Sequence, residues 1–207
     1  MSRRLHLLPP WPALALVALL ALGACSRYGL IAVERIEIAS TYSVEPGIKW
    51  NYLLGQDIEL WTVDGLSLQN MFFVSGIEDG DTLLVGKPEF DFFNESKIPE
   101  YREGFSLLDI REWIEASYAQ AEVARMETHD FRPVRFGSKK GFRFEFSFTN
   151  EDGLSQKGFV VGAAIDEELH LIIFTAAALH FYDKFAPEAE RIIRSIRIEG
   201  DDKPAFN

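Results

Sequence analysis

The chain has 207 residues, 47% of them hydrophobic, and its 21 Lys and Arg against 32 Asp and Glu give a formal net charge of −11. A surface this acidic repels phosphate backbones, so nucleic acid is not expected as a partner. The single cysteine excludes an internal disulfide. Stability must therefore come from packing, for which 17 Phe, 6 Tyr and 4 Trp supply large apolar surfaces.

The first 25 residues have the layout of an export signal. Two early arginines precede an apolar run over residues 13–22, and small residues then lead to the one cysteine. A basic start, a short apolar core and small residues before the cleavage point are typical of a secretory signal. The sequence Leu22-Gly23-Ala24-Cys25 resembles the lipobox of bacterial lipoproteins. This resemblance implies that the Cys25 thiol is acylated and becomes the first residue of the mature chain.

A lipobox implies a chain held on a membrane surface of the cell envelope, on the periplasmic side, by lipid at Cys25. Ser26 after the cysteine is similar to lipoproteins sorted to an outer membrane, provided that the host has two membranes. Two alternatives stay open. Residues 7–25 approach the roughly 20 residues that span a bilayer, which fits an uncleaved signal anchor. A soluble exported protein with a cleaved signal is the other.

The pattern along the chain divides it into four parts. Residues 1–24 are the predicted signal peptide, and residues 25–33 a tether whose apolar end allows a strand or helix to begin there. Residues 34–199 form a single predicted domain, long enough for a sizeable core. Residues 200–207 are a polar tail that is expected to fray.

Short antiparallel strands are predicted in the first half, where polar and apolar residues alternate. They cover residues 34–38, 48–53, 57–63, 66–74 and 82–85. Residues 87–105 then break the pattern, and connections of this length are often functional. Phe90, Phe92 and Phe93 lie there between acidic residues, so they either fold back over the core or contact a partner.

Longer elements are predicted in the second half. Ser106 and Asp109 have the spacing of a capping box, with Asp in place of Glu or Gln, which predicts a helix from there to about Ala124. Phenylalanines at every second position from 142 to 148 predict a strand with one aromatic face. Residues 181–195 have apolar side chains at helical spacing. The remaining strands are predicted at residues 135–136, 141–149, 156–164, 169–175 and 196–198.

This order predicts an α+β fold, an antiparallel β-sheet packed by two main helices. The closing helix with its Ser195-Ile196 ending, after a Phe-rich hairpin and a third strand, resembles the PsbP-like family of extrinsic photosystem proteins and their bacterial lipoprotein relatives. The resemblance covers residues 105–198 well and the first half in outline. It implies an α/β/α sandwich with a binding or assembly role, and its packing motifs carry no catalytic residues.

Sequence motifs for catalysis or metal binding are absent. There is no GxSxG elbow or P-loop, and His129, His170 and His180 lack zinc-ligand spacing. His170 falls on the polar register of a strand and is expected at the surface. The acidic segments 78–81 and 151–152 are interpreted as solvated turns, with calcium as the open alternative. No cofactor, metal site or catalytic residue is predicted.

The sequence therefore favours a non-catalytic, membrane-anchored envelope lipoprotein that acts as a binding or assembly module. Its expected contacts are the membrane, through lipid at Cys25, and another envelope protein, with Phe90, Phe92 and Phe93 as candidate contact residues. Two alternatives stay open: a carboxylate-based hydrolase of envelope polymers, and a carrier that holds a small apolar ligand in the Phe-rich interior. Trp50 and Trp61 fit either the core or a groove.

Overall fold

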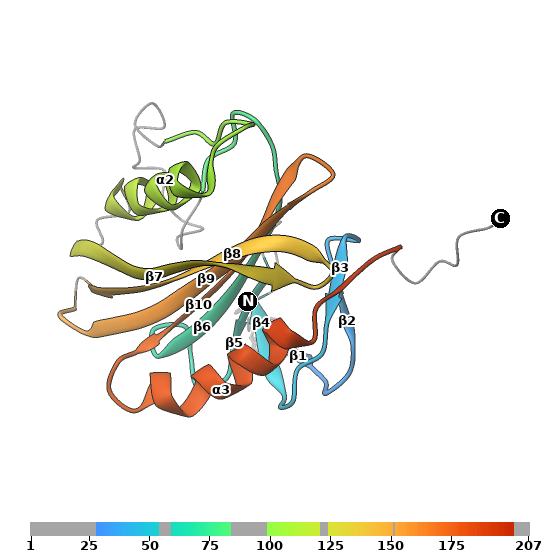
Figure 1. The fold of residues 1–207 in the computed structure, drawn as a ribbon. Coiled ribbons are helices and arrows are strands. Elements are labelled where there is room, and N and C mark those ends of the chain that lie inside the picture. Colours follow the sequence, from blue (N-terminus) through green and yellow to red (C-terminus); the bar gives the residue numbers. More distant parts are fainter. Residues whose placement is uncertain (1–27, 54–58, 84–98, 121–123, 151, 201–207) are drawn as a thin grey trace, which may run out of the picture.

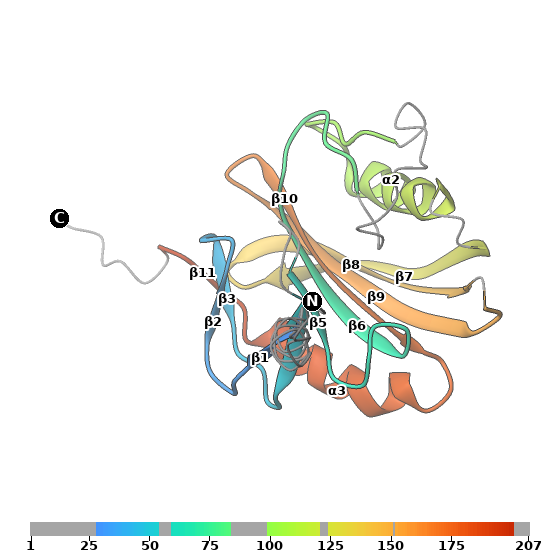
Figure 2. The same cartoon turned by 180° about the vertical axis from the view of Figure 1, so that it is seen from behind.

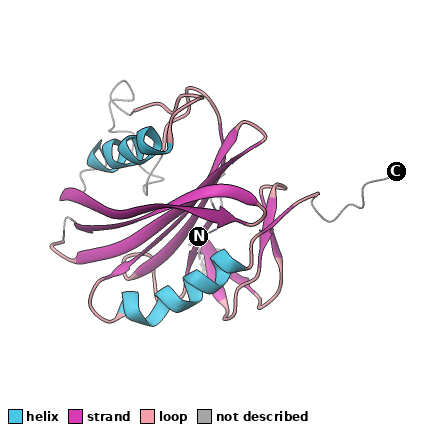
Figure 3. Cartoon of the chain, in the orientation of Figure 1, coloured by secondary structure: helices cyan, strands magenta, loops and turns pink. Residues whose placement is uncertain are grey.

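The computed structural model describes residues 28–53, 59–83, 99–120, 124–150 and 152–200. Its centre is an eight-stranded, fully antiparallel sheet with one helix on each face (Figures 1 and 3). In sheet order the strands are β1 (Tyr28–Ile31), β4 (Trp50–Leu53), β5 (Glu59–Thr62), β6 (Gln69–Ile77), β10 (Glu168–Ala177), β9 (Ser155–Ile165), β8 (Lys139–Thr149) and β7 (Ala124–Phe136). The predicted α+β fold with two main helices is confirmed.

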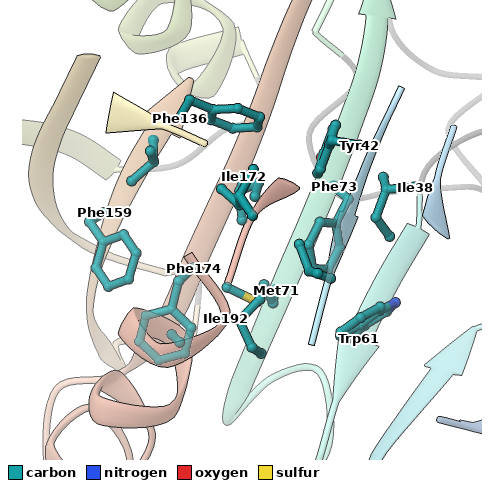
Figure 4. Packing of buried hydrophobic residues seen from close by; sticks show 14 of the residues in the cluster. Ile38, Tyr42, Trp61, Met71, Phe73, Phe136, Phe159, Ile172, Phe174 and Ile192 are labelled. Carbon is teal, nitrogen blue, oxygen red and sulfur yellow. The ribbon is translucent and has the colours of Figure 1, made fainter. Parts of the chain in front are cut away.

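One core lies between the sheet and α3 (Phe181–Arg194). Phe185, Ala189 and Ile192 are buried along a single stripe of this helix, as the helical spacing predicted. They pack on side chains that β9 and β10 direct to the same face, among them Phe159 and Phe174 (Figure 4). We call this cluster the α3-side core.

A second core lies on the other face, under α2 (Leu107–Gln120). Its centre is the row of phenylalanines of β8, of which Phe142, Phe144 and Phe146 are buried. The rings of Phe142 and Phe144 stack 6.4 Å apart at 9°. The predicted aromatic face of this strand is confirmed, and we call the cluster the α2-side core.

The predicted capping box begins α2. The Ser106 backbone N donates to Asp109 Oδ2 at 2.8 Å, and the Asp109 backbone N donates to Ser106 Oγ at 3.2 Å. These reciprocal bonds satisfy two donors that a helix start otherwise leaves free. The hydrogen bonds from Ser106 also hold the pKa of Asp109 below its usual value. A local sequence signal thus fixed the helix start correctly.

A small three-stranded sheet covers one end of the α3-side core. Two of its strands were predicted, within residues 34–38 and 196–198, but their pairing with a third was not. The sheet consists of β2 (Ile36–Ile38), β3 (Tyr42–Val44) and β11 (Arg197–Ile198), in the order β11-β3-β2. Arg35 ties it to the end of α3, because its guanidinium donates to the Ser195 carbonyl at 3.0 Å and to Glu45 Oε2 at 3.1 Å. Residues from both ends of the domain therefore close this side.

Several boundaries differ from the prediction. The helix predicted to run to about Ala124 ends at Gln120, and Ala124 begins β7. Strand β7 runs over 13 residues, whereas only its last two were predicted, because register shifts at 124–127 and 129–132 interrupt its alternation. Residues 25–33 were assigned to a tether, yet Tyr28–Ile31 form strand β1, paired with β4. In place of a strand at 82–85, Thr82 makes an isolated bridge to Glu100, and residues 84–85 lie outside the described part of the chain.

Replacing Phe185 by Ala should lower the free energy of unfolding by about 3–5 kcal/mol, because it truncates a buried ring in the α3-side core. Denaturant titration measures the change. Arg194→Ala is a matched control on an exposed position of the same helix and should shift stability by about 0.5 kcal/mol or less. Equal effects of the two substitutions would contradict the packing of α3.

Candidate functional site

A cleft of about 760 Å³ opens between the α2 side of the sheet and the chain segment that leads into α2. Strands β7, β8 and β9 form its floor at their β7–β8 hairpin end, and residues 101–110 form its roof. Its volume falls in the range of about 300–1,000 Å³ typical of ligand sites. The cleft is open to solvent, so it differs from the enclosed cavity that a carrier of a small apolar ligand needs.

The floor combines apolar and cationic side chains. In the β7–β8 ladder Arg135 lies opposite Lys140, and Pro133 lies opposite Phe142. The Lys140 side chain makes no hydrogen bond or ion pair among the described residues, and the Arg135 guanidinium donates to the Ser138 carbonyl of its own hairpin at 2.8 Å. Like charges placed directly opposite each other disfavour strand pairing. The floor thus contains two cations at paired positions, an arrangement that disfavours the pairing of β7 with β8.

The roof is held by contacts on both sides. Tyr101 packs edge-on against Phe105, with ring centroids 5.5 Å apart, and also against Trp113 of α2 at 5.5 Å. Its backbone N donates to the Asp81 carbonyl at 2.6 Å. The Glu103 backbone N donates to Asp79 Oδ1 at 3.0 Å. These bonds tie residues 101–105 to the turn that follows β6.

The acidic segment 78–81, interpreted as a turn or a calcium site, therefore has a structural role. Asp81 Oδ2 accepts a hydrogen bond from the Glu78 backbone N at 2.8 Å, and Asp79 lies 3.5 Å from the Arg102 guanidinium. No group of three or more His, Cys, Asp or Glu within the described residues is arranged to hold a metal ion. The hydrogen bonds support the interpretation as a turn.

Charges of both signs surround the cleft. Glu103 of the roof and Glu167 of the β9–β10 turn join Arg135 and Lys140 in the lining, and all four residues are exposed. Phe105, Leu107, Ile110 and Phe142 supply the apolar part. An apolar centre with a charged rim is the arrangement found in protein interfaces. It also offers carboxylates, but both are exposed to water.

A second unusual feature, the environment of His170, is buried in the core. His170 of β10 was predicted at the surface, and this prediction is wrong, because its side chain is 0% exposed. Both faces of β10 are covered, so the alternation of His170 with its leucine neighbours separates two cores and does not mark a solvent face. His170 points to the α3-side core, where its ring meets Tyr42 of β3 edge-on at 6.0 Å.

A bulge in β6 makes room for this histidine. Between two regular pairs of the β6–β10 ladder, Ser75 and Gly76 together lie opposite His170, and Gly76 has a φ of +73°. A Cβ at Gly76 would lie 3.5 Å from the Glu168 carboxylate, whose Oε2 is itself 3.8 Å from His170 Nε2. That contact leaves room for a Cβ, so the positive φ at this bulge is what favours glycine at position 76.

Several polar atoms of this region are buried without a hydrogen bond. They are Tyr42 Oη, Ser75 Oγ and both ring nitrogens of His170, although Ser75 and Tyr42 are close neighbours. Burial lowers the pKa of His170, against the opposite effect of the Asp166 charge. Burial likewise raises the pKa of Tyr42. Because His170 is buried, the cluster is a sensitive part of the core and is not a site for an external substrate.

The other residues singled out in the sequence have varied positions. Cys25 and the phenylalanines Phe90, Phe92 and Phe93 lie outside the described residues, so their assigned roles stay predictions. Trp50 and Trp61 are both 0% exposed and belong to the α3-side core, which excludes the groove. Among the described residues, no helix has the length and apolar content needed to cross a membrane.

The cleft itself was not predicted, because its lining comes from segments far apart in the sequence. One signal was available. Gly137-Ser138 forms a two-residue turn, and recognising it as a hairpin would have placed Arg135 opposite Lys140. No comparable signal indicates that residues 101–107 lie above this hairpin.

The buried His170 should make stability depend on pH. Its folded-state pKa lies below the ordinary value of 6.5, so below about pH 6.5 the unfolded chain binds more protons and folding weakens as the pH falls. We expect His170→Leu to reduce this loss between about pH 6.5 and 5. Denaturant midpoints across that range measure it, with His129→Leu, an exposed histidine, as the control. Identical pH slopes for all three chains would contradict the assignment.

Comparison with known proteins finds no matching family model and no matching curated sequence. A crystal structure from Bacteroides thetaiotaomicron VPI-5482 is similar over 78% of this chain at 12% identity and a TM-score of 0.43, and the match spans only 46% of that chain. The solution structure of cyanobacterial PsbP (CyanoP) from Synechocystis sp. PCC 6803 is similar over 86% of this chain and 99% of its own, at 10% identity and a TM-score of 0.45. At these identities the likeness concerns the fold alone.

Proposed function

We propose that this chain is a non-catalytic binding module of the cell envelope, anchored to a membrane by lipid at Cys25, that holds a partner protein in the cleft between β7–β9 and residues 101–110. The observation that carries the proposal is the cleft, with its apolar centre and a rim of both charge signs. The sequence around Cys25 supplies the anchor.

The placement of the two cations of the cleft floor supports a binding role. Arg135 and Lys140 lie opposite each other against the preference of a β-ladder. Positions at which a local rule is broken tend to be functional. A partner that brings a carboxylate between the two cations would offset their repulsion, and an apolar side chain of the partner would cover Phe105 and Leu107.

A binding role also fits the chemistry of the cleft better than hydrolysis. Its two carboxylates belong to Glu103 and Glu167, which are exposed residues on separate loops. A general acid near neutral pH needs a raised pKa, which burial normally supplies. The histidine with a lowered pKa, His170, lies on the opposite face of the sheet, in the α3-side core.

The anchor is tested by substituting its cysteine. Cys25→Ser should abolish incorporation of labelled palmitate and release the chain from the membrane fraction or leave its signal uncleaved, because the acylated thiol is gone. Ser26→Ala is the matched control and should keep its label. Unchanged labelling of Cys25→Ser would refute the lipid anchor.

The cleft is tested by site-specific cross-linking in cells. A photo-reactive amino acid at Leu107, which lines the cleft and is 42% exposed, should give one defined protein adduct. The control is Leu179, which is 85% exposed at the opposite end of β10. Because Leu179 is the more exposed of the two, random collisions favour it. Adducts of equal yield at both positions would contradict a partner site in the cleft.

A further inference from the structure

The exposed charges that line the cleft are separated by sign. Arg135 and Lys140 lie on the paired strands β7 and β8, and β7 is the outermost strand of the sheet. Glu167 lies in the turn between β9 and β10, and the Glu103 backbone is hydrogen-bonded to Asp79 in the turn that follows β6. The sheet order β6-β10-β9-β8-β7 therefore gives the cleft a cationic flank at β7–β8 and an acidic flank toward β6 and β10.

The two flanks do not neutralise each other within one chain. Neighbouring strands lie about 4.8 Å apart, so two strand spacings, about 10 Å, separate β7 from β9 and the turn that follows it. The side chains of Lys140, Glu103 and Glu167 make no hydrogen bond or ion pair among the described residues, although all three line the cleft. Each flank can therefore pair with charges of a partner.

The roof of the cleft is a projecting element. Figures 1 and 2 show the segment that leads into α2 beside the turn that follows β6. Residues 102–104 of this segment are exposed, and a Cβ at Gly104 would meet no atom within 4 Å. The same face of the molecule thus presents a hollow, which is the cleft, and a projection, which carries Glu103 and the half-buried Phe105.

These features define what a partner surface must offer. It needs carboxylates for the cationic flank, cations for the acidic flank, a projection for the hollow and a hollow for the roof. A second copy of the chain, turned by 180°, offers all four, because a two-fold interface places the same patch of both copies in contact. A purely acidic partner would instead be repelled by Glu103 and Glu167.

The net charge of −11 repels a second copy at long range only. At physiological ionic strength, exposed charges more than about 8 Å apart are largely screened from each other. The charges that come into contact in the interface then decide whether two copies pair, and these are of opposite sign.

We infer that the partner held in the cleft is a second copy of this chain, in a two-fold symmetric dimer in which the roof of each copy enters the cleft of the other. Glu103 of one copy then lies against Arg135 and Lys140 of the other. The exposed part of Phe105 packs on Pro133 of the opposite floor. The inference rests on the proposed function, because it names the partner of that same site.

The test is a charge exchange in the full-length chain, co-expressed with two different affinity tags. The acidic variant carries Arg135→Glu and Lys140→Glu, and the basic variant carries Glu103→Lys and Glu167→Lys. Wild type should capture wild type from detergent-solubilised cells, whereas each variant should capture itself about ten-fold less, because like charges then meet. The acidic variant should capture the basic variant at the wild-type yield, because every contact again joins opposite charges.

The restored pair also controls for folding, since both variants must be folded to give it. Arg194→Glu with Arg197→Glu, at exposed positions outside the cleft, should leave self-capture unchanged. Absence of wild-type self-capture would overturn the dimer. A mixed pair that is captured no better than either folded variant with itself would overturn it too.

The photo-cross-link at Leu107 needs no charge substitution and separates this inference from the proposed function. An adduct with twice the mass of the chain supports both. A defined adduct with another protein overturns the second copy as occupant, while the partner site in the cleft stands. A yield no higher than that at Leu179 means that both fail.

Discussion

Burial of both faces of the central strands is the constraint on which this structure depends. Nine of the ten residues of β10 are buried, because α3 covers one face and α2 the other. Adjacent residues of such a strand enter different cores, as Ile172 and Ile173 do. Strands in this position are therefore apolar at successive residues and do not alternate with polar ones. Every polar side chain on these strands must therefore be accommodated inside one of the two cores.

Arg143 and His170 are accommodated in two different ways in the α3-side core. The Arg143 guanidinium is paired with Glu190 of α3 at 2.8 Å and lies 3.9 Å from the centre of the Phe159 ring. It thereby ties β8 to α3, and losing Glu190 would leave a buried charge without this partner. Burial lowers the pKa of His170, which disfavours its charged form. Arg143 is thus accommodated by a carboxylate partner, whereas burial favours the neutral form of His170.

Burial of both sheet faces also determines which elements could be predicted from the sequence. The capping box at Ser106 and the stripe of α3 are local signals of one face and one helix start, and both predictions are confirmed. Alternation in β10 was misinterpreted at His170 because that strand has no solvent face. The bulges of β7 and the register that joins β3 to β11 depend on distant partners, so no local pattern contains them. The cleft follows from the same distant pairings.

Contacts within the domain connect the cleft to the edge of the sheet at which β1 lies. Glu188 fixes the turn that carries Ile48, and α3 packs on the sheet whose other face supports α2 and the roof of the cleft. Ile48 and Leu107 are therefore attached to opposite faces of one sheet. Under the proposed anchor, β1 begins three residues after the lipid-bearing Cys25, so the sheet starts near the bilayer. The height at which a partner meets the cleft above the bilayer would then be set by the sheet itself.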